Sequence, residues 1–429
     1  MRRVVVTGLG VVAPNGVGKE AFWEACCNGQ SGVGPIRSFD ATGHPVKIAA
    51  EVHNFDVTPF LRPNQRKSLK IMGRAMRFAV GAAGLAIRDS GLEWDKQDPT
   101  RVGVVMGTGL VPVELPEIMP TLTSSCDAQG NLETYRLGQK GAGALFPLWI
   151  LKYLPNMVAA HISLAYNAQG PNSTITTACS AGTQAVGEAF RLIARGDADI
   201  VLSGGADSRI DPLLILAYAA LGALSQSERP AHEVSRPFDG KRDGFVLGEG
   251  AGVLILEELE HAKKRGAVIY AEILGLGSSF DAYTATQPDP EAKGAARAIT
   301  EALREARVDH HDVNYINAHG TSTRLNDRME TVAVKRVFGD GAKVLPLSSI
   351  KSMVGHLIGA AGAVEAIALA LTLSSGVLPP TINQTQRDPE CDLDYVPNNA
   401  RETPARVAVS TSFGFGGQNA ALVMSRFVG

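Results

Sequence analysis

The sequence predicts an α/β fold built from two similar halves, and three observations support this. Short β-branched runs alternate with helical patterns along the 429-residue chain, as is typical of α/β proteins. A helix-then-strand unit occurs twice, and so does a glycine-rich turn that leads into an apolar strand. Because 45% of the residues are hydrophobic, a chain of this length can fill two domain-sized cores or one large composite core.

The expected strands of the first half are residues 4–6, 102–105, 200–202 and 253–256. A helix ending in DSGL (89–92) precedes the strand RVGVVMGTG (101–109), and the helix ITEALREARV (299–308) precedes NYINAHGTS (314–322). The turn-strand pair is GEGAGVLIL (248–256) and GFGGQNAALVM (414–424). We therefore expect an N-terminal half at 1–265 and a C-terminal half at 266–429, with the boundary where the charged helix end KKRG gives way to a new strand.

Two further segments echo each other, namely the helices that follow Cys179 and His356. Both begin with small residues and become apolar on most faces, which predicts close packing in a buried centre. The stretch 356–373 is long enough to span a membrane, but it contains His356 and Glu365. We expect a buried helix and no membrane span. No long Pro/Gly/Ser linker separates the halves, so one compact body is expected.

Charge and cysteine content exclude several classes of function. With 41 basic and 43 acidic residues the net charge is −2, which gives no global field for nucleic acid or an anionic membrane. The five cysteines are odd in number and contain no CxxC pair, so we expect neither disulfides nor a zinc site. A reducing, cytoplasmic location fits, since no signal-peptide pattern follows the first strand. No dinucleotide, phosphate-loop or HExxH fingerprint is present, so no cofactor and no metal is expected.

Cys179 is the candidate nucleophile. It lies in TTACSAGTQAVGEAF, between a strand-like run and a helix start. The helix dipole there favours a thiolate over a thiol, so we expect a reactive cysteine near neutral pH. A lone cysteine is more often a small buried hydrophobe, and the two histidine motifs are what weigh against that alternative.

The histidine motifs are NAHGTST around His319 and SIKSMVGHLIGAAG around His356. His319 follows a strand, and His356 opens the small-residue helix, with Lys351 five positions earlier. Either histidine alone could be a satisfied core residue. The turn TSFGFGGQN has glycines on both sides of Phe415, so its backbone N–H groups could approach a reacting carbonyl, although many structural turns share this pattern.

The order of TACSAG, NAHGTST, KSMVGH, GAAGAVE and SFGFGGQN resembles the elongating Cys-His-His branch of the β-ketoacyl-[acyl-carrier-protein] synthases. The likeness covers nearly the whole chain, including GDADIVLSGGAD and SRPFDGKRDGFVLGEGAGVLILEELEHAKKRGA. It implies a thiolase fold with duplicated halves in a layered αβαβα arrangement, and a homodimer. It also implies decarboxylating condensation of an acyl group with malonyl-acyl carrier protein (ACP), as in fatty-acid elongation.

The resemblance assigns roles residue by residue. Cys179 would carry the acyl group, while His319 and His356 would support decarboxylation of the malonyl group. Lys351 and Glu365 resemble the supporting pair, and the backbone N–H groups of Cys179 and Phe415 resemble an oxyanion hole. Positions implied to contact substrate are Thr321, Thr323, Phe413 and Phe415. Simple turn chemistry for the threonines and core packing for the phenylalanines remain alternatives.

A carrier-protein partner needs a basic landing site, and the segment LRPNQRKSLKIMGRAMR (61–77) provides six basic and no acidic residues. If this segment is one helix, Arg66, Lys70, Arg74 and Arg77 form a single stripe beside Lys67. We expect acyl carrier protein to dock on Arg66, Lys67, Lys70 and Arg74. A solvated helix face is the alternative interpretation.

The segment 107–143 departs from the family pattern and is more than ten residues longer, so no acyl-chain preference carries over. Arg324 and Gln418 also stand where a proline and a threonine are common. The alternative function is the ketosynthase α subunit of a type II polyketide, polyene or unusual-lipid pathway. A chain-length-factor-like partner would be a non-enzyme, but it would lack the nucleophile that Cys179 supplies.

Overall fold

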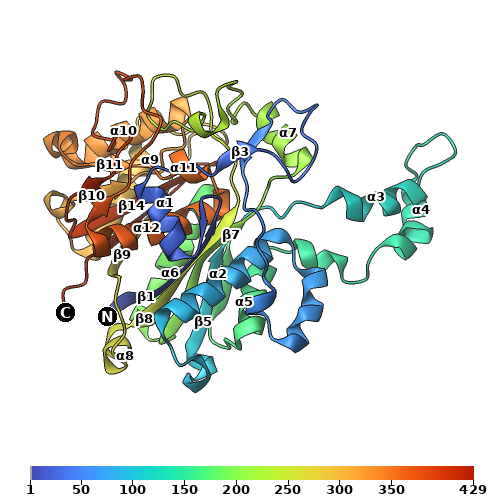
Figure 1. Cartoon of the computed structure of the whole chain (residues 1–429), viewed down its shortest axis with the longest axis horizontal. Helices are drawn as coiled ribbons and strands as arrows, with labels where there is room; N and C mark the ends of the chain where they lie inside the picture. The colour runs from blue at the N-terminus through green and yellow to red at the C-terminus, as the bar shows by residue number, and fades with distance from the viewer. Residues whose placement is uncertain (1) are drawn as a thin grey trace.

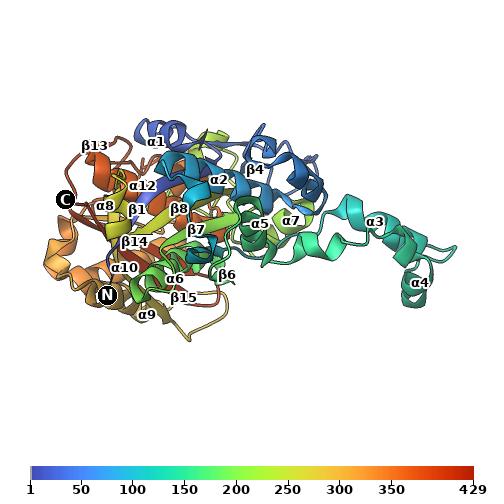
Figure 2. The same ribbon diagram turned by 90° about the horizontal axis from the view of Figure 1, so that it is seen from below.

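The computed structural model describes residues 2–429, which form a rounded body with one long arm (Figure 1). The arm carries α3 (Leu115–Ser124) and α4 (Thr134–Gln139) and projects away from the body in two perpendicular views (Figures 1 and 2). Both chain ends lie on the body, at the side opposite the arm (Figure 1).

One mixed sheet of eleven strands organises the body. Its N-terminal part has the order β1 (Val4–Ala13), β8 (Gly250–Glu258), β7 (Ile200–Asp207), β5 (Val102–Gly107) and β6 (Asn172–Ile175), with β2 (Gly16–Val17) paired to β1. Its C-terminal part has the order β9 (Ala271–Phe280), β15 (Gln418–Ser425), β14 (Val407–Gly414), β10 (Tyr315–Asn317) and β11 (Leu347–Ser348). All ten residues of β1 are buried, as expected for a strand covered on both faces.

The two parts of the sheet have the same topology. Numbering the strands of each part in chain order gives the spatial order 1-5-4-2-3 in both. In both parts the first two pairings are antiparallel and the last two are parallel. The parts join where β1 and β9 pair antiparallel, at Val4–Ile273, Val5–Glu272 and Val6–Ala271. The duplication predicted from the sequence is therefore confirmed strand by strand.

Helices complete five layers. At the centre α6 (Ala181–Arg195) and α12 (Ala361–Ser375) pack on each other and contact strands of both half-sheets. They approach so closely that a Cβ on Gly182 would lie 2.7 Å from the Ala363 backbone nitrogen. One outer layer contains α2 (Arg74–Ser90) and α5 (Met157–Tyr166), and the other contains α9 (Lys293–Ala306) and α10 (Arg324–Phe338). The order is thus αβαβα, as predicted.

The remaining elements are shorter. The helices are α1 (Lys19–Cys27), α7 (Pro212–Ala220), α8 (Leu259–Lys264) and α11 (Lys351–Val354), and the small sheets pair β3 (Val33–Pro35) with β4 (Ile48–Ala50) and β12 (Val377–Leu378) with β13 (Arg401–Glu402). The segment Ile358–Ser375 is long and apolar enough to cross a membrane, but 89% of it is buried inside the protein. It is the central helix expected from the sequence.

Candidate active site

Cys179 lies at the mouth of the central helix α6. A short 3₁₀ turn, Ala178–Ser180, links β6 to this helix, and Ala178 has a positive φ of 50°. A left-handed conformation at a non-glycine residue is uncommon and signals a constrained turn. The turn directs the Cys179 thiol away from the helix and into the protein, where the residue is only 3% exposed.

The two histidines approach the thiol from the C-terminal half. His319 follows β10, and its backbone N–H donates to Glu330 Oε1 at 2.8 Å and to Thr411 Oγ1 at 3.1 Å. His356 lies between α11 and α12, and its backbone N–H donates to the Val246 carbonyl at 2.8 Å. Both histidines are buried. The backbones of both histidines are therefore held by hydrogen bonds that do not involve their imidazole rings.

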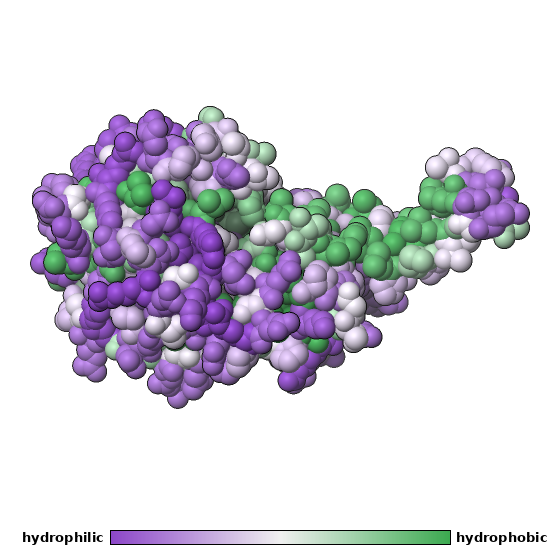
Figure 3. All heavy atoms as spheres, turned by 90° about the horizontal axis from the view of Figure 1, so that it is seen from above, coloured by the Kyte–Doolittle hydropathy of each residue, from purple (hydrophilic) through white to green (hydrophobic). Residues whose placement is uncertain are grey.

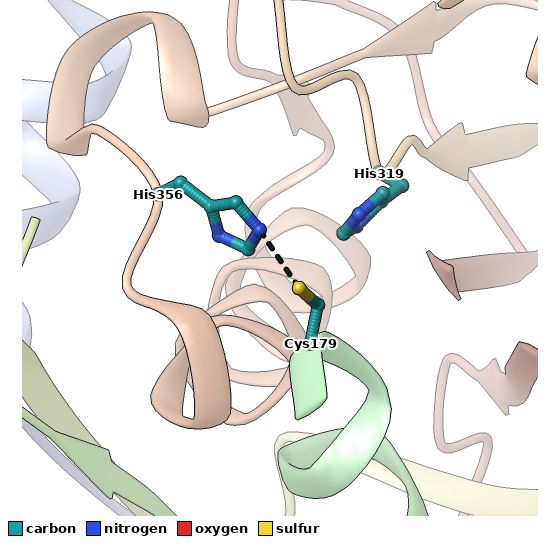
Figure 4. A group of neighbouring side chains, drawn as sticks. All are labelled: Cys179, His319 and His356. Carbon is teal, nitrogen blue, oxygen red and sulfur yellow. Dashed lines mark hydrogen bonds between the residues drawn. The ribbon is translucent and has the colours of Figure 1, made fainter. Parts of the chain in front are cut away.

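The three side chains meet in one place (Figure 4). His356 Nε2 lies 3.1 Å from Cys179 Sγ, and the two imidazole rings are 5.4 Å apart in an edge-to-face arrangement. Figure 4 shows the His319 ring on the other side of the sulfur, which leaves the thiol between the two rings. The sequence separations are 140 and 177 residues (319 − 179 and 356 − 179), so only the fold brings this group together.

Hydrogen bonds fix the tautomer of each imidazole. The Lys351 ammonium, which can only donate, lies 3.2 Å from His319 Nδ1 and also donates to the His319 carbonyl at 2.7 Å. The Ile358 N–H donates to His356 Nδ1 at 3.2 Å. Both Nδ1 atoms are therefore acceptors, so each neutral ring carries its proton on Nε2. Two Nε2–H groups face the same cavity.

Lys351 and Glu365 form a buried ion pair behind His319. Burial raises the pKa of the Glu365 carboxyl, and the Lys351 ammonium opposes that rise. Burial, followed by the positive charge of Lys351, holds the pKa of both His319 and His356 well below the usual range. The two imidazoles are consequently neutral at pH 7.

The expectation of a ready thiolate at Cys179 is wrong. Burial raises the pKa of the thiol to about 11, although Lys351, Arg209 and the Phe415 N–H each lower it. The helix-start position was the basis of the expectation, and it did not account for the desolvation of a side chain enclosed by two rings and apolar residues. At pH 7 the cysteine is therefore a thiol.

One backbone N–H faces the sulfur from the turn at the end of β14. The Phe415 N–H lies against the thiol, and a Cβ on Gly414 would lie 3.4 Å from the Cys179 backbone nitrogen. Glycine at 414 thus permits the close approach of the two backbones. The structure brings the predicted oxyanion groups of Cys179 and Phe415 together.

A cleft of about 420 Å³ leads from the surface to this group. The four predicted substrate positions, Thr321, Thr323, Phe413 and Phe415, all line it. Thr321 Oγ1 and Thr323 Oγ1 are 3.0 Å apart, and Thr323 also caps α10 by accepting from the Asn326 N–H. Phe413 is buried edge-on to His319 at 5.7 Å, whereas Phe415 is 38% exposed.

The sequence placed two acidic residues on a loop after His319 and gave them no role, whereas both are buried on α10. Glu330 accepts hydrogen bonds from the backbone N–H groups of His319 and Gly320, and burial raises its pKa to about 7. Asp327 accepts from the Phe238 N–H and pairs with Arg242 at 3.3 Å. Acidic residues three positions apart, 8 and 11 residues after His319, were the available signal. They secure the loop that carries His319.

The predicted docking segment is not one helix. A 3₁₀ helix, Pro63–Ile71, ends before Met72 and Gly73, and α2 begins at Arg74. The single stripe through Arg66, Lys70, Arg74 and Arg77 is therefore wrong. Arg74 is bound to the buried Glu249 through Nε and Nη2, at 2.7 and 2.5 Å, so its charge is already neutralised. Arg66, Lys67 and Lys70 are exposed and make no ion pair with any residue in 2–429.

Two groups in the described chain have ligand atoms close enough to hold a metal ion. One is Cys179 with His319 and His356, whose ligand atoms lie within 4.8 Å of one another, and the other is Asp309, His310 and His311, of which His310 is partly buried and the other two are exposed. The first group suits a soft ion such as Zn²⁺, which would block the thiol and both Nε2 atoms.

Comparisons with known proteins agree with the site. The family model for the β-ketoacyl synthase N-terminal domain matches residues 1–262, and that for the C-terminal domain matches 270–385. A Coxiella burnetii protein named 3-oxoacyl-[acyl-carrier-protein] synthase 2 is 45% identical, with 99% of each chain covered. A Synechocystis protein of the same name is 42% identical, covering 99% of this chain and 98% of its own.

Solved structures cover the whole chain as well. A type II polyketide ketosynthase, in complex with its acyl-carrier protein and bound to a hexaketide, superimposes with a TM-score of 0.87 at 37% identity. The ishigamide ketosynthase/chain length factor gives 0.87 at 36%, and a β-ketoacyl synthase from Burkholderia phymatum gives 0.88 at 34%. Each of these covers 100% of both chains.

Proposed function

The chain belongs to the β-ketoacyl synthase family, and from that premise we propose that it condenses an acyl group held on Cys179 with malonyl-ACP to give β-ketoacyl-ACP, releasing CO₂. It is an acyltransferase with the thiolase fold. One observation carries the proposal. Two neutral imidazoles present Nε2–H groups to a cavity that contains a single thiol. The reaction needs this combination of one nucleophile and two hydrogen-bond donors.

The first step transfers the acyl group to the enzyme. Cys179 Sγ attacks the thioester carbonyl, the bond to the pantetheine sulfur breaks, and the thiol proton ends on that leaving sulfur. The carbonyl oxygen becomes negative in the tetrahedral intermediate, where the N–H groups of Cys179 and Phe415 stabilise it. Each such donor is worth about 3 kcal/mol of barrier height.

The second step forms the carbon–carbon bond. The malonyl thioester loses CO₂, and the electron pair of the broken bond moves into an enolate whose oxygen accepts from His319 and His356 Nε2–H. The enolate carbon attacks the acyl carbonyl on Cys179, the bond from that carbonyl to the Cys179 sulfur breaks, and the sulfur takes up one proton from water. Because charge develops on the enolate only as CO₂ departs, donors already in place stabilise the transition state more than the substrate. No redox change occurs, so this reaction balances without a cofactor.

The lysine–glutamate pair has a positioning role in this proposal. Lys351 holds His319 in the Nε2–H tautomer and, by its charge, opposes protonation of the ring. Glu365 offsets the ammonium charge in the buried interior. Thr321 and Thr323 would hydrogen-bond the pantetheine arm in the cleft, and Phe415, as the more exposed aromatic, would move aside when the acyl group enters.

A homodimer and a carrier-protein partner are part of the proposal. The arm exposes apolar side chains to solvent, among them Leu110, Met119, Tyr135, Phe146 and Ile150, and Figure 3 shows this apolar surface running from the body along the arm. Such a surface on a projecting arm calls for a partner, and we infer a second copy of the chain. For acyl carrier protein we retain Arg66, Lys67 and Lys70 as the landing site. A cytoplasmic location fits five cysteines that are all free.

A second candidate is a ketosynthase of a specialised pathway. The structures of a hexaketide-bound ketosynthase and of the ishigamide enzyme match this chain over its full length, and the chemistry at Cys179 would be the same. The relatives at 42–45% identity are named 3-oxoacyl-[acyl-carrier-protein] synthase 2 and are more similar in sequence than these two structures, so fatty-acid elongation is the first choice.

The test is trapping of the acyl intermediate. Purified enzyme given acyl-pantetheine should gain one acyl mass on Cys179, and addition of malonyl-ACP should then release β-ketoacyl-ACP and CO₂. Cys179→Gln should lose acylation but continue to release CO₂ from malonyl-ACP, because both histidines remain. Acylation at another residue, or no CO₂ release by this variant or by the wild type, would contradict the proposal.

A further inference from the structure

An arginine is buried beside the nucleophile. Arg209 follows β7 by two residues, and its side chain is 9% exposed. Its Nε donates to Asp207 Oδ1 at 3.0 Å, its Nη2 to Asp207 Oδ2 at 2.9 Å, and its Nη1 to Tyr218 Oη at 2.5 Å. Asp207 Oδ2 also accepts from the Gly359 N–H at 3.0 Å. The arginine is thus held rigidly from two sides.

This group adjoins the apolar cluster that contains Cys179. Tyr218 packs against the apolar cluster that contains Cys179, and its ring is 6.0 Å from the ring of Phe245, which in turn is 5.2 Å from His356. The guanidinium itself packs on Gly109 at the root of the arm, where a Cβ would lie 1.7 Å from Nη2. Glycine at 109 therefore makes room for the arginine.

Arg209 and Tyr218 have hydrogen-bond donors that no protein acceptor within residues 2–429 uses. A guanidinium has five N–H groups. Two of them go to Asp207 and one goes to Tyr218, so each Nη atom keeps one hydrogen without an acceptor in the described part of the chain. The Tyr218 hydroxyl accepts from Arg209 and still has its own proton to donate. Donors buried among apolar residues are costly unless an acceptor reaches them.

The charges of Arg209 and Asp207 limit which chemical group can be that acceptor. Arg209 and Asp207 already neutralise each other. A carboxylate on the substrate would bring a second negative charge to one guanidinium, and a purely aliphatic chain would bury the spare donors without any acceptor. A ketone or hydroxyl oxygen satisfies them at no cost in charge.

We propose that Arg209 and Tyr218 are specificity-determining residues that recognise a neutral oxygen, a ketone or hydroxyl, on the acyl chain that Cys179 accepts. This inference rests on the proposed function, because it concerns the acyl group that the condensation extends. It assigns the enzyme oxygenated acyl substrates in preference to saturated ones of equal length, and it therefore favours the specialised pathway, the second candidate function, over fatty-acid elongation.

The test is a competition between matched acyl groups. Wild-type enzyme is mixed with equal amounts of hexanoyl-pantetheine and either 5-oxohexanoyl- or 3-hydroxyhexanoyl-pantetheine, and the early acyl-Cys179 products are weighed by mass spectrometry. At least one oxygenated group should be favoured on the order of tenfold, since its rival leaves buried donors without an acceptor. Tyr218→Phe and Arg209→Lys should each reduce that preference toward unity while hexanoyl labelling persists.

The variants are chosen to keep the fold. Lysine at 209 retains a positive charge opposite Asp207, and persisting hexanoyl labelling reports an intact site. The matched control is Arg265→Lys, which alters an arginine bound to Glu257 at 2.8 and 2.7 Å and should leave the preference unchanged. Equal labelling by all three groups in the wild type, or an undiminished preference in both variants, overturns the inference alone. No labelling of Cys179 by any of them overturns the proposed function as well.

Discussion

The two halves of the chain contain the same strained turn, but the residue that follows the strained position differs between them. Ala178 and Ile358 both have positive φ, 50° and 49°, and each begins a 3₁₀ turn that leads into a central helix. A left-handed non-glycine residue costs about 1–2 kcal/mol of conformational energy, so the turn is similarly strained in both halves. The next residue is Cys179 in one half and Gly359 in the other.

What surrounds these two positions explains why only one half can serve as the site of the proposed reaction. At Cys179 the nearby Phe415 N–H and two imidazoles leave room for a substrate carbonyl. At Gly359 the space is filled, because a Cβ there would lie 2.9 Å from both Asp207 Oδ2 and the Thr108 carbonyl carbon. The strained 3₁₀ turn is thus present in both halves. The side chains packed against each copy determine whether it can bind a substrate, as proposed for Cys179, or only packs against its neighbours, as at Gly359.

The test with the largest expected effect moves the cysteine from one turn to the other. Cys179→Ala should lower condensation by at least about 10⁴-fold, as for other lost nucleophiles. Adding Gly359→Cys should restore nothing, because the new thiol would face Asp207 and Thr108 and not the imidazoles. Condensation is measured with acyl- and malonyl-ACP, with Cys391→Ala as the active control. Recovery of activity in the double variant would show that the two turns are interchangeable.

A second test measures how strongly burial acts on the Cys179 turn. With the pKa of its thiol raised to about 11, alkylation by iodoacetamide should accelerate about tenfold per pH unit from pH 7 to 10, because the thiolate fraction rises in that proportion. A simple cysteine peptide levels off near its usual pKa of about 8.5. Peptide mass spectrometry gives the rate at each pH. A plateau below pH 9 would mean that the nearby donors outweigh desolvation.

A third, smaller effect is expected at the structural turn. Gly359→Ala adds a methyl group where no space exists and should destabilise the fold by about 1–3 kcal/mol, measured by urea unfolding. Gly34→Ala is the control, since nothing lies within 4 Å of its Cβ position. If both variants unfold alike, Asp207 and Thr108 move aside easily and the joint is less tightly packed than described.

The smallest effect concerns the surface of the N-terminal half. Reversing Lys67 and Lys70 to Glu should raise KM for ACP-bound substrates by about fivefold, more at low salt, and leave pantetheine substrates unaffected. Lys263 and Lys264, exposed on α8, provide a control with the same change in net charge. Equal losses on both substrates would indicate damage to the site, and no loss would leave the segment as ordinary surface.

Sequence patterns predicted the strands, the duplication and the three residues that meet at the cleft, Cys179, His319 and His356, because these depend on local periodicity and on motifs around single residues. The pKa of Cys179 could not be predicted, since it depends on enclosure by residues 140 and 177 positions away. The break in the helix at Gly73 could have been predicted, because glycine is unfavourable in a helix interior. The hydrogen bond from Arg74 to Glu249 could not, because the two residues are 175 positions apart in the sequence.

Strand β1 also has a consequence for how the protein is made. It lies in the middle of the large sheet and pairs with β8 and β9, roughly 250 residues later in the chain. Val12 and Ala13 pair with β2, which follows directly, but at about 5–20 residues synthesised per second the other buried residues of β1 wait on the order of tens of seconds for their partners. During that interval VVVTGLGV is an unpaired aggregation-prone strand on the ribosome, so a chaperone that binds short apolar segments should hold nascent chains until residue 280 has emerged.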